Sequence, residues 1–119
     1  MDTRSLECFG TDPRARGVRV EVSPRQSYIL AHEHFVYSEF TATNEGEALR
    51  LVFVSHEVRL TGHLLRRLET AIQTRELAWV AARPERYRGA QSERAFVSKL
   101  TINDLSLDHA EPTPANSDA

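Results

Sequence analysis

The stretch TGHLLRRLETAIQTRE, residues 61–76, decides the fold, because it has the clearest helical period in the chain. Thr61 precedes the apolar run, and its hydroxyl suits the N-cap position of a helix. The apolar side chains then recur at helical spacing, at Leu64, Leu65, Leu68, Ala71 and Ile72. Burying such a stripe is worth about 8 kcal/mol before entropy, so the helix must pack on a sheet. The sequence therefore predicts one central helix over about residues 61–76.

Strand-forming segments lie on both sides of this helix. The expected strands are residues 18–22, 28–43, 49–54, 58–60, 77–82 and 95–102. The apolar phase of the long 28–43 segment changes at His32-Glu33-His34, which indicates a bulge or a tight bend. Short connections between neighbouring strands favour antiparallel pairing. These features predict an α+β fold, a mainly antiparallel sheet or half-barrel of five to six strands with one central helix between strands.

The length of 119 residues, 40% of them hydrophobic and 27% charged, fits a single domain. We expect this α+β domain to cover residues 17–107. Residues 1–16 carry Gly10, Pro13 and scattered charges without periodicity, and they are expected to form an N-terminal tail. Residues 108–119 are small, polar and proline-containing, which predicts a disordered C-terminal tail.

Three features indicate a cytoplasmic protein without membrane association. No apolar run approaches the roughly 20 residues that span a bilayer, and the N-terminus has no apolar stretch of signal-peptide length. Cys8 is the only cysteine, so no intramolecular disulfide can form, which fits a reducing compartment. Cys8 lies in a polar segment, and we do not expect it to be a nucleophile.

Charge is segregated along the chain, although the net charge is only −2. Residues 33–57 carry five glutamates against one arginine, whereas residues 59–94 carry eight arginines against four glutamates. A run in the basic part combines arginines with one ring, at Arg83, Arg86, Tyr87, Arg88 and Arg94. Charge for phosphates and a ring for stacking are typical of single-stranded nucleic acid binding. Glu85 and Glu93 dilute this run and the chain is acidic overall, so a solvated polar loop is the simpler interpretation.

Histidines provide a second candidate site, because imidazole is the commonest metal ligand in proteins. On an extended segment, His32 and His34 share a face and present two nitrogens to one ion. His56 in a hairpin loop, or His63 at the start of the helix, would supply a third ligand. This spacing is far less specific than H-E-x-x-H, which the sequence lacks, so surface or core-edge histidines are the simpler interpretation.

No motif indicates an enzyme or a cofactor. Ser55, His56 and Asp104 contain the residue types of a catalytic triad, but no G-x-S-x-G elbow accompanies them. The five glycines are scattered singly, so no glycine-rich phosphate loop is present either.

The surplus of strand over helix favours self-association. The strands at 18–22 and 95–102 are the expected sheet edges, and exposed edges pair unless they are blocked. One helix leaves part of a sheet face uncovered, and the apolar residues expected there are Val52, Val54, Trp79 and Val97. The sequence thus favours a non-enzymatic interaction or assembly module that forms a homodimer. A nucleic-acid-binding module using the arginine-rich loop and a metal-binding protein using the histidines are the alternatives.

Overall fold

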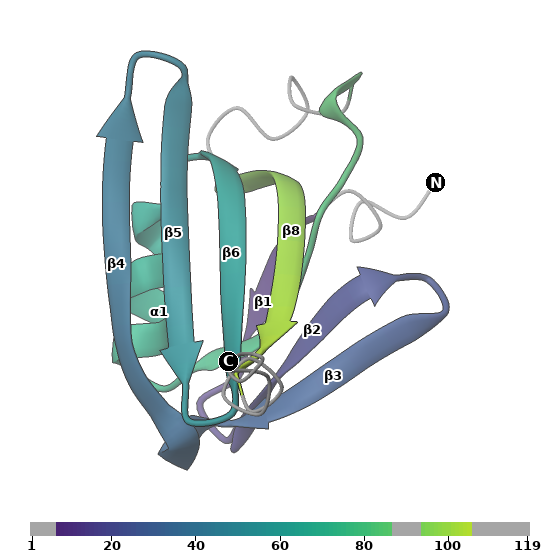
Figure 1. Cartoon of the computed structure of the whole chain (residues 1–119), viewed down its shortest axis with the longest axis vertical. Helices are drawn as coiled ribbons and strands as arrows, with labels where there is room; N and C mark the ends of the chain where they lie inside the picture. Colours follow the sequence, from purple (N-terminus) through teal and green to yellow (C-terminus); the bar gives the residue numbers. More distant parts are fainter. Residues whose placement is uncertain (1–6, 87–93, 106–119) are drawn as a thin grey trace, which may run out of the picture.

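The structure is a computed structural model that describes residues 7–86 and 94–105. Strands make up 60% of these residues and helical turns 15%. The described strands form two four-stranded sheets, with one α-helix (Figure 1). The predicted α+β fold with a single sheet or half-barrel of five to six strands is therefore wrong. The described part of the chain is mostly β because the helix is shorter than predicted and an additional strand forms before residue 17, and its strands divide between two sheets.

The first sheet has the strand order β1-β7-β2-β3. Its strands are β1 (Phe9–Thr11), β7 (Leu77–Ala81), β2 (Gly17–Ser23) and β3 (Gln26–Ala31). β2 and β3 form an antiparallel hairpin, whereas β7 lies parallel to β2 and antiparallel to β1. Part of the segment that we expected to be an N-terminal tail thus belongs to a sheet, and β2, an expected edge, lies inside that sheet.

The second sheet is an antiparallel one with the order β4-β5-β6-β8. Its strands are β4 (Phe35–Thr43), β5 (Gly46–Phe53), β6 (His56–His63) and β8 (Phe96–Asp104). A 3₁₀ turn, η2 (His32–His34), joins β3 to β4 and carries the chain from one sheet to the other. The bend that the change of apolar phase predicted at this point is confirmed.

The helix α1 (Arg66–Gln73) is shorter than predicted at both ends. β6 continues through His63, so Thr61 is a strand residue and not the N-cap. The Glu47 carboxylate of β5 takes that role, because its Oε1 accepts a hydrogen bond of 2.7 Å from the Leu65 N–H. At the other end the Glu76 N–H bonds to the carbonyl of Ala71, which closes the last turn.

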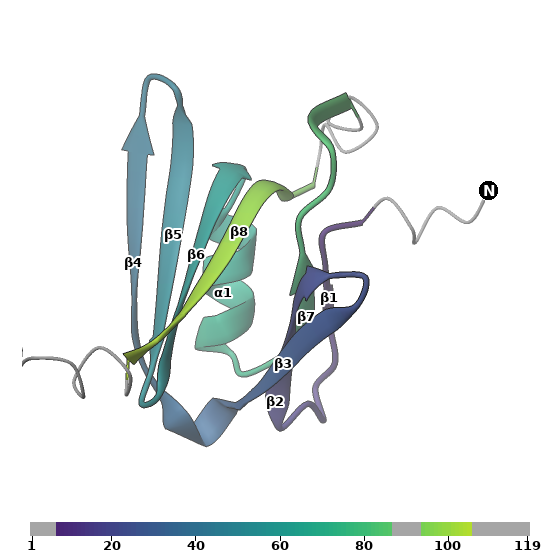
Figure 2. The ribbon, with the colours of Figure 1, turned by 45° about the vertical axis from the view of Figure 1, so that its right-hand side comes forward.

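One hydrophobic core lies between the two sheets, and α1 packs inside it (Figure 2). The helix contributes Leu68, Ala71 and Ile72 to this core. Cys8 connects the sheets, because its sulfur accepts a hydrogen bond of 3.2 Å from the Val97 N–H at the start of β8. Burial raises the pKa of the Cys8 thiol, which keeps it protonated and unreactive.

The second apolar set expected on one sheet face is divided among different places. Val52 and Val97 are buried, Trp79 is half-buried against Gly10, and Val54 is exposed. These residues therefore do not form one uncovered apolar face. In the part of the chain that the structure describes, no helix has the length and hydropathy required to cross a bilayer.

Candidate functional site

β4 is the edge strand of the second sheet. It pairs with β5 on one side, and no strand of the described ranges 7–86 and 94–105 pairs with its other side (Figure 1). The strand is nine residues long, FVYSEFTAT, and Glu39 is its only charged residue. Natural edges are usually protected by lysine, proline or short length, and β4 has none of these. Its free side is therefore suited to pairing with another strand.

The register on β5 determines which backbone groups of β4 face the free side. Successive residues of an antiparallel strand direct their N–H and C=O groups alternately toward the partner and away from it. Thr43 and Gly46 form the pair that closes the two-residue turn between β4 and β5. Counting back from this pair, the backbone groups of Ser38, Phe40 and Ala42 face the free edge.

Exposed apolar side chains lie beside the η2 end of this edge. Val36, Tyr37 and Val54 are 57%, 45% and 68% exposed. Val36 occupies a bulge, because the pairing register on β5 shifts between Phe35 and Tyr37. The Val54 N–H bonds to the His34 carbonyl at 2.8 Å, which holds Val54 next to η2. We call these three residues the apolar patch. Exposed apolar side chains beside an open edge are typical of a docking surface.

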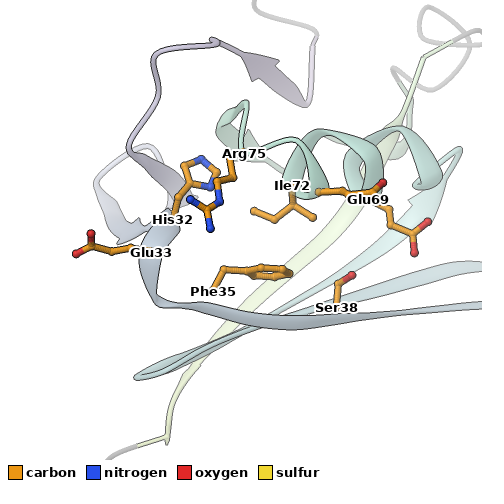
Figure 3. Close-up of a pocket in the computed structure, with 8 residues that line it drawn as sticks. His32, Glu33, Phe35, Ser38, Glu69, Ile72 and Arg75 are labelled. Atoms are coloured by element: carbon orange, nitrogen blue, oxygen red, sulfur yellow. The ribbon is translucent and has the colours of Figure 1, made fainter.

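A cavity of about 590 Å³ opens between η2, β4 and α1. Its lining residues are His32, Glu33, Phe35, Ser38, Glu69, Ile72, Gln73 and Arg75. Figure 3 shows His32 and Arg75 at one end of the cavity and Phe35 and Ile72 in the middle. Ser38 and Glu69 lie at the other end, while the Glu33 side chain points away. The cavity therefore has a basic end, an apolar middle and a polar far end.

His32 is the buried polar residue of this cavity, with only 6% of its surface exposed. Its Nε2 lies 2.9 Å from the carbonyl oxygen of Leu77. Because a carbonyl only accepts, Nε2 must carry the proton of the neutral ring. Nδ1 is then an acceptor, and it is buried without a hydrogen-bond partner among the described residues. Such an orphaned group is rare in folded proteins and requires an explanation.

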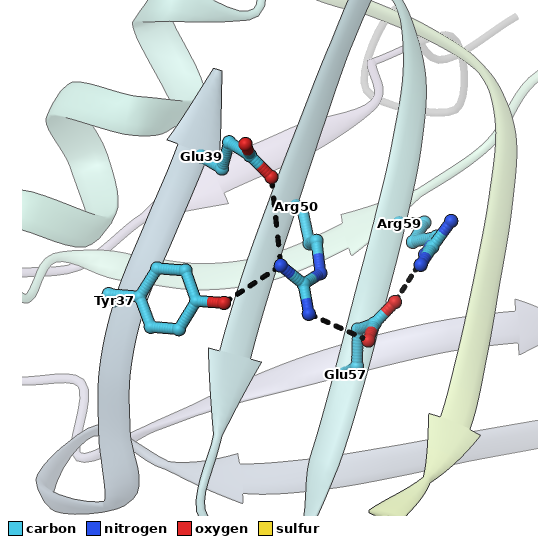
Figure 4. Close-up of polar contacts among 5 residues, drawn as sticks. All are labelled: Tyr37, Glu39, Arg50, Glu57 and Arg59. Atoms are coloured by element: carbon cyan, nitrogen blue, oxygen red, sulfur yellow. Dashed lines mark hydrogen bonds and ion pairs between the residues drawn. The ribbon is translucent and has the colours of Figure 1, made fainter. Parts of the chain in front are cut away.

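Charged side chains cross the outer face of the second sheet in one connected network (Figure 4). Arg50 donates to the Tyr37 hydroxyl at 2.8 Å and to Glu57 at 3.3 Å, and it lies 3.6 Å from Glu39. Arg59 also donates to the buried Glu57 carboxylate. This bond, more than any other contact, holds the pKa of Glu57 below its ordinary value, although burial opposes the shift. The ionised Glu57 fixes Arg50, which in turn holds Tyr37 and Glu39 on the edge strand.

The structure does not bring the predicted metal ligands together. His32 is buried against Leu77, whereas His34 is exposed beside Glu33. His56 lies elsewhere, with its Nδ1 2.7 Å from the Ser55 hydroxyl. The 3₁₀ turn explains the separation, because His32 and His34 would share a face only on an extended strand. Within the residues that are described, no three His, Cys, Asp or Glu side chains form a group able to hold an ion.

The described arginines of the arginine-rich loop make different contacts. Arg83 is half-buried, with its guanidinium 5.9 Å from the centre of the Trp79 ring. Arg94 forms an ion pair with Glu7, and Arg86 is exposed. Tyr87 and Arg88 lie outside the described residues.

Sequence reasoning missed the β4 edge because it treated residues 28–43 as one piece and assigned the edges to the first and last strands. β8 is indeed an edge strand, but β2 is not. The low charge of residues 35–43 was the signal for an unprotected edge. The cavity gave no such signal, since its lining residues come from separate segments.

Comparison with known proteins adds no functional assignment: no protein-family model, curated protein or solved structure matches this chain.

Proposed function

We propose that the chain is a non-enzymatic interaction module that forms a two-fold homodimer by pairing β4 with β4 of a second copy. The open nine-residue edge of β4 carries this proposal, together with the apolar patch beside it. Pairing two such edges joins two four-stranded sheets into one continuous sheet of eight strands. The backbone groups of Ser38, Phe40 and Ala42 then gain partners, and the patch is shielded from water.

Charge selects the register of this pairing. A two-fold axis at Glu39 would place two carboxylates directly opposite each other, which is unfavourable. An axis at Ser38 instead places Tyr37 opposite Glu39 of the second copy, and Val36 opposite Phe40. Glu39 then adds a second partner for the Tyr37 hydroxyl, which Arg50 already holds in position. The Ser38 backbone groups face the free edge, so two Ser38 residues can form a hydrogen-bonded pair.

The interface must also be large enough to persist in solution. A specific contact buries at least about 1,000 Å² in total. The edge backbone alone does not supply such an area, so we expect the apolar patch and the exposed side of α1 to contribute. Figure 1 shows α1 behind β4 and β5, where a second copy paired on β4 would bring its own helix nearby.

Cysteine cross-linking of the full chain tests both the pairing and its register. In the proposed dimer, the two Ser38 Cα atoms lie about 5.5 Å apart, within the range that a disulfide spans. Ser38→Cys should therefore form a covalent dimer under mild oxidation. The native Cys8 is buried and does not react in the folded protein, and denaturation in excess alkylating agent blocks it before the dimer is analysed.

Thr41→Cys is the matched control on the same strand. In the Ser38 register, the two Thr41 residues are displaced by six positions, or about 20 Å, so no disulfide can form. A dimer of Thr41→Cys but not of Ser38→Cys would contradict the register. If neither variant cross-links at a concentration where both are folded, pairing of β4 in the Ser38 register is excluded.

A further inference from the structure

We propose that the cavity between η2, β4 and α1 binds a small carboxylate that carries a neighbouring hydroxyl or amine donor and an apolar body. The cavity shares Ser38 with the strand pairing proposed above, but the groups that would hold the ligand, Arg75, His32, Phe35 and Ile72, do not depend on that pairing. The volume of about 590 Å³ lies in the range of small-molecule sites. Three features of the lining define the ligand: a cation, a buried acceptor and an apolar middle.

Arg75 supplies the cation. Arg75 is exposed and lines the cavity, and its guanidinium has no ion-pair or hydrogen-bond partner in the described part of the chain. The two lining carboxylates do not neutralise it, because Glu69 pairs with Arg66 at 3.1 Å and Glu33 points away into solvent (Figure 3). An arginine that has no carboxylate partner in the protein favours a ligand with a carboxylate, which it can bind with two parallel hydrogen bonds.

The backbone at Arg75 supports a role for its side chain. Arg75 follows α1 with a φ of 62°, the left-handed conformation in which a helix end usually has glycine. A residue with a Cβ is strained there. Strained backbone that persists is typical of binding sites, where the side chain has a function that glycine cannot provide.

His32 defines the second group of the ligand. Its ring is fixed by the bond from Nε2 to the Leu77 carbonyl, which leaves Nδ1 as an acceptor without a partner. His32 and Arg75 lie at the same end of the cavity (Figure 3). Nδ1 has less than 1 Å² of accessible surface, so a donor attached next to the carboxylate satisfies it only when side chains at this end move aside. The donor would satisfy the one polar atom of the described residues that is buried and unpaired at this end of the cavity.

The middle of the cavity accommodates the apolar body. Phe35 and Ile72 face each other there from β4 and α1 (Figure 3). The Phe35 ring is held by an edge-on contact with Phe53, with the ring centres 5.5 Å apart. A flat or branched apolar group bound between Phe35 and Ile72 would leave its polar end at Arg75 and His32.

A titration of the full chain with three related probes tests the ligand class without any mutation. The probes are 3-phenyllactate, 3-phenylpropionate, which lacks the hydroxyl, and phenethylamine, which is cationic. Calorimetry should give the tightest binding for phenyllactate and about fivefold weaker binding for phenylpropionate, the effect of one hydrogen bond. Phenethylamine should not bind. Equal binding of the amine and the two acids, or no saturable binding of phenyllactate at millimolar concentration, would overturn the proposal.

Arg75→Gly tests the cation, with Arg67→Ala as the control. Glycine suits the left-handed backbone, so Arg75→Gly should fold with an unchanged or higher melting temperature. Its affinity for phenyllactate should fall at least about tenfold, the effect of a charged hydrogen bond. Arg67 is an exposed arginine of α1 that does not line the cavity, and its replacement should change the affinity by less than twofold. A folded Arg75→Gly variant with wild-type affinity would overturn the assignment.

Discussion

Gly62 of β6 lies close to the backbone of β8, and replacing it by alanine should disrupt this end of the second sheet. A Cβ at position 62 would lie 1.8 Å from the Phe96 carbonyl oxygen and 3.1 Å from the Val97 Cα. Real Cβ contacts essentially never fall below 3.0 Å, so the first gap must widen by at least 1.2 Å. The opposing atoms belong to the backbone of β8, and no side-chain rotation can relieve the clash.

The cost of Gly62→Ala follows from what this displacement breaks. Phe96 and Val97 are buried core residues, and overpacking next to such residues costs about 2 kcal/mol. Separating the strands also weakens about two backbone hydrogen bonds, each worth about 1 kcal/mol. The sum of about 4 kcal/mol is a large part of the 5–15 kcal/mol that stabilises a typical domain.

Urea unfolding, followed through the fluorescence of the single tryptophan Trp79, measures this cost. Gly17→Ala is the matched control, because its Cβ would meet Leu30 O at 3.0 Å and a methyl group of the exposed Ile29 at 3.1 Å. We expect the control to lose less than about 1 kcal/mol. A Gly62→Ala variant as stable as the control would refute the close approach of β6 to β8.

Three further substitutions test the core, the ion-pair network and the helix cap. Leu68→Ala truncates a fully buried side chain of α1 and should lower the free energy of unfolding by about 2–5 kcal/mol; a melting temperature within a degree or two of wild type would contradict the placement of the core. Glu57→Gln should lose about 1–3 kcal/mol at neutral pH. Because the pKa of Glu57 is lowered in the folded protein, the difference in the free energy of unfolding between wild type and Glu57→Gln should persist above about pH 5. It should disappear as the pH falls through that lowered pKa. A difference that does not change with pH would contradict the ionised network. Glu47→Ala removes the acceptor of the Leu65 N–H and should cost about 1 kcal/mol in thermal unfolding, and an unchanged melting temperature would show that the cap is not stabilising.

The local periods of the sequence predicted the buried side of the helix and most strands. Leu68 and Ile72 lie in the core where the helical spacing placed them, and the change of apolar phase located the turn η2. The predicted ends of the helix were wrong, because tertiary contacts determine where the helix begins and ends. Pairing with β8 extends β6 through His63, and the carboxylate that caps the helix belongs to Glu47, far from it in sequence.

The division into two sheets was not predictable from local pattern. β7 lies between β1 and β2, so each of its neighbours comes from a distant part of the chain. β1 has only three residues and becomes a strand by pairing with β7. The candidate site depends on the same long-range arrangement. His32 and Arg75 meet at one cavity only because α1 packs beside β4, and neither residue belongs to a motif that indicates this.

The molar mass of the full chain in solution, measured by size-exclusion chromatography with light scattering, tests the proposed β4 pairing most directly. Wild type at micromolar concentration should have twice the chain mass of 13.5 kDa. Ser38→Pro should be monomeric with an unchanged circular dichroism spectrum, because it removes an N–H that faces the free edge and leaves the β4–β5 ladder intact. A wild-type mass of 13.5 kDa, or a Ser38→Pro variant that remains dimeric, would contradict the proposed pairing.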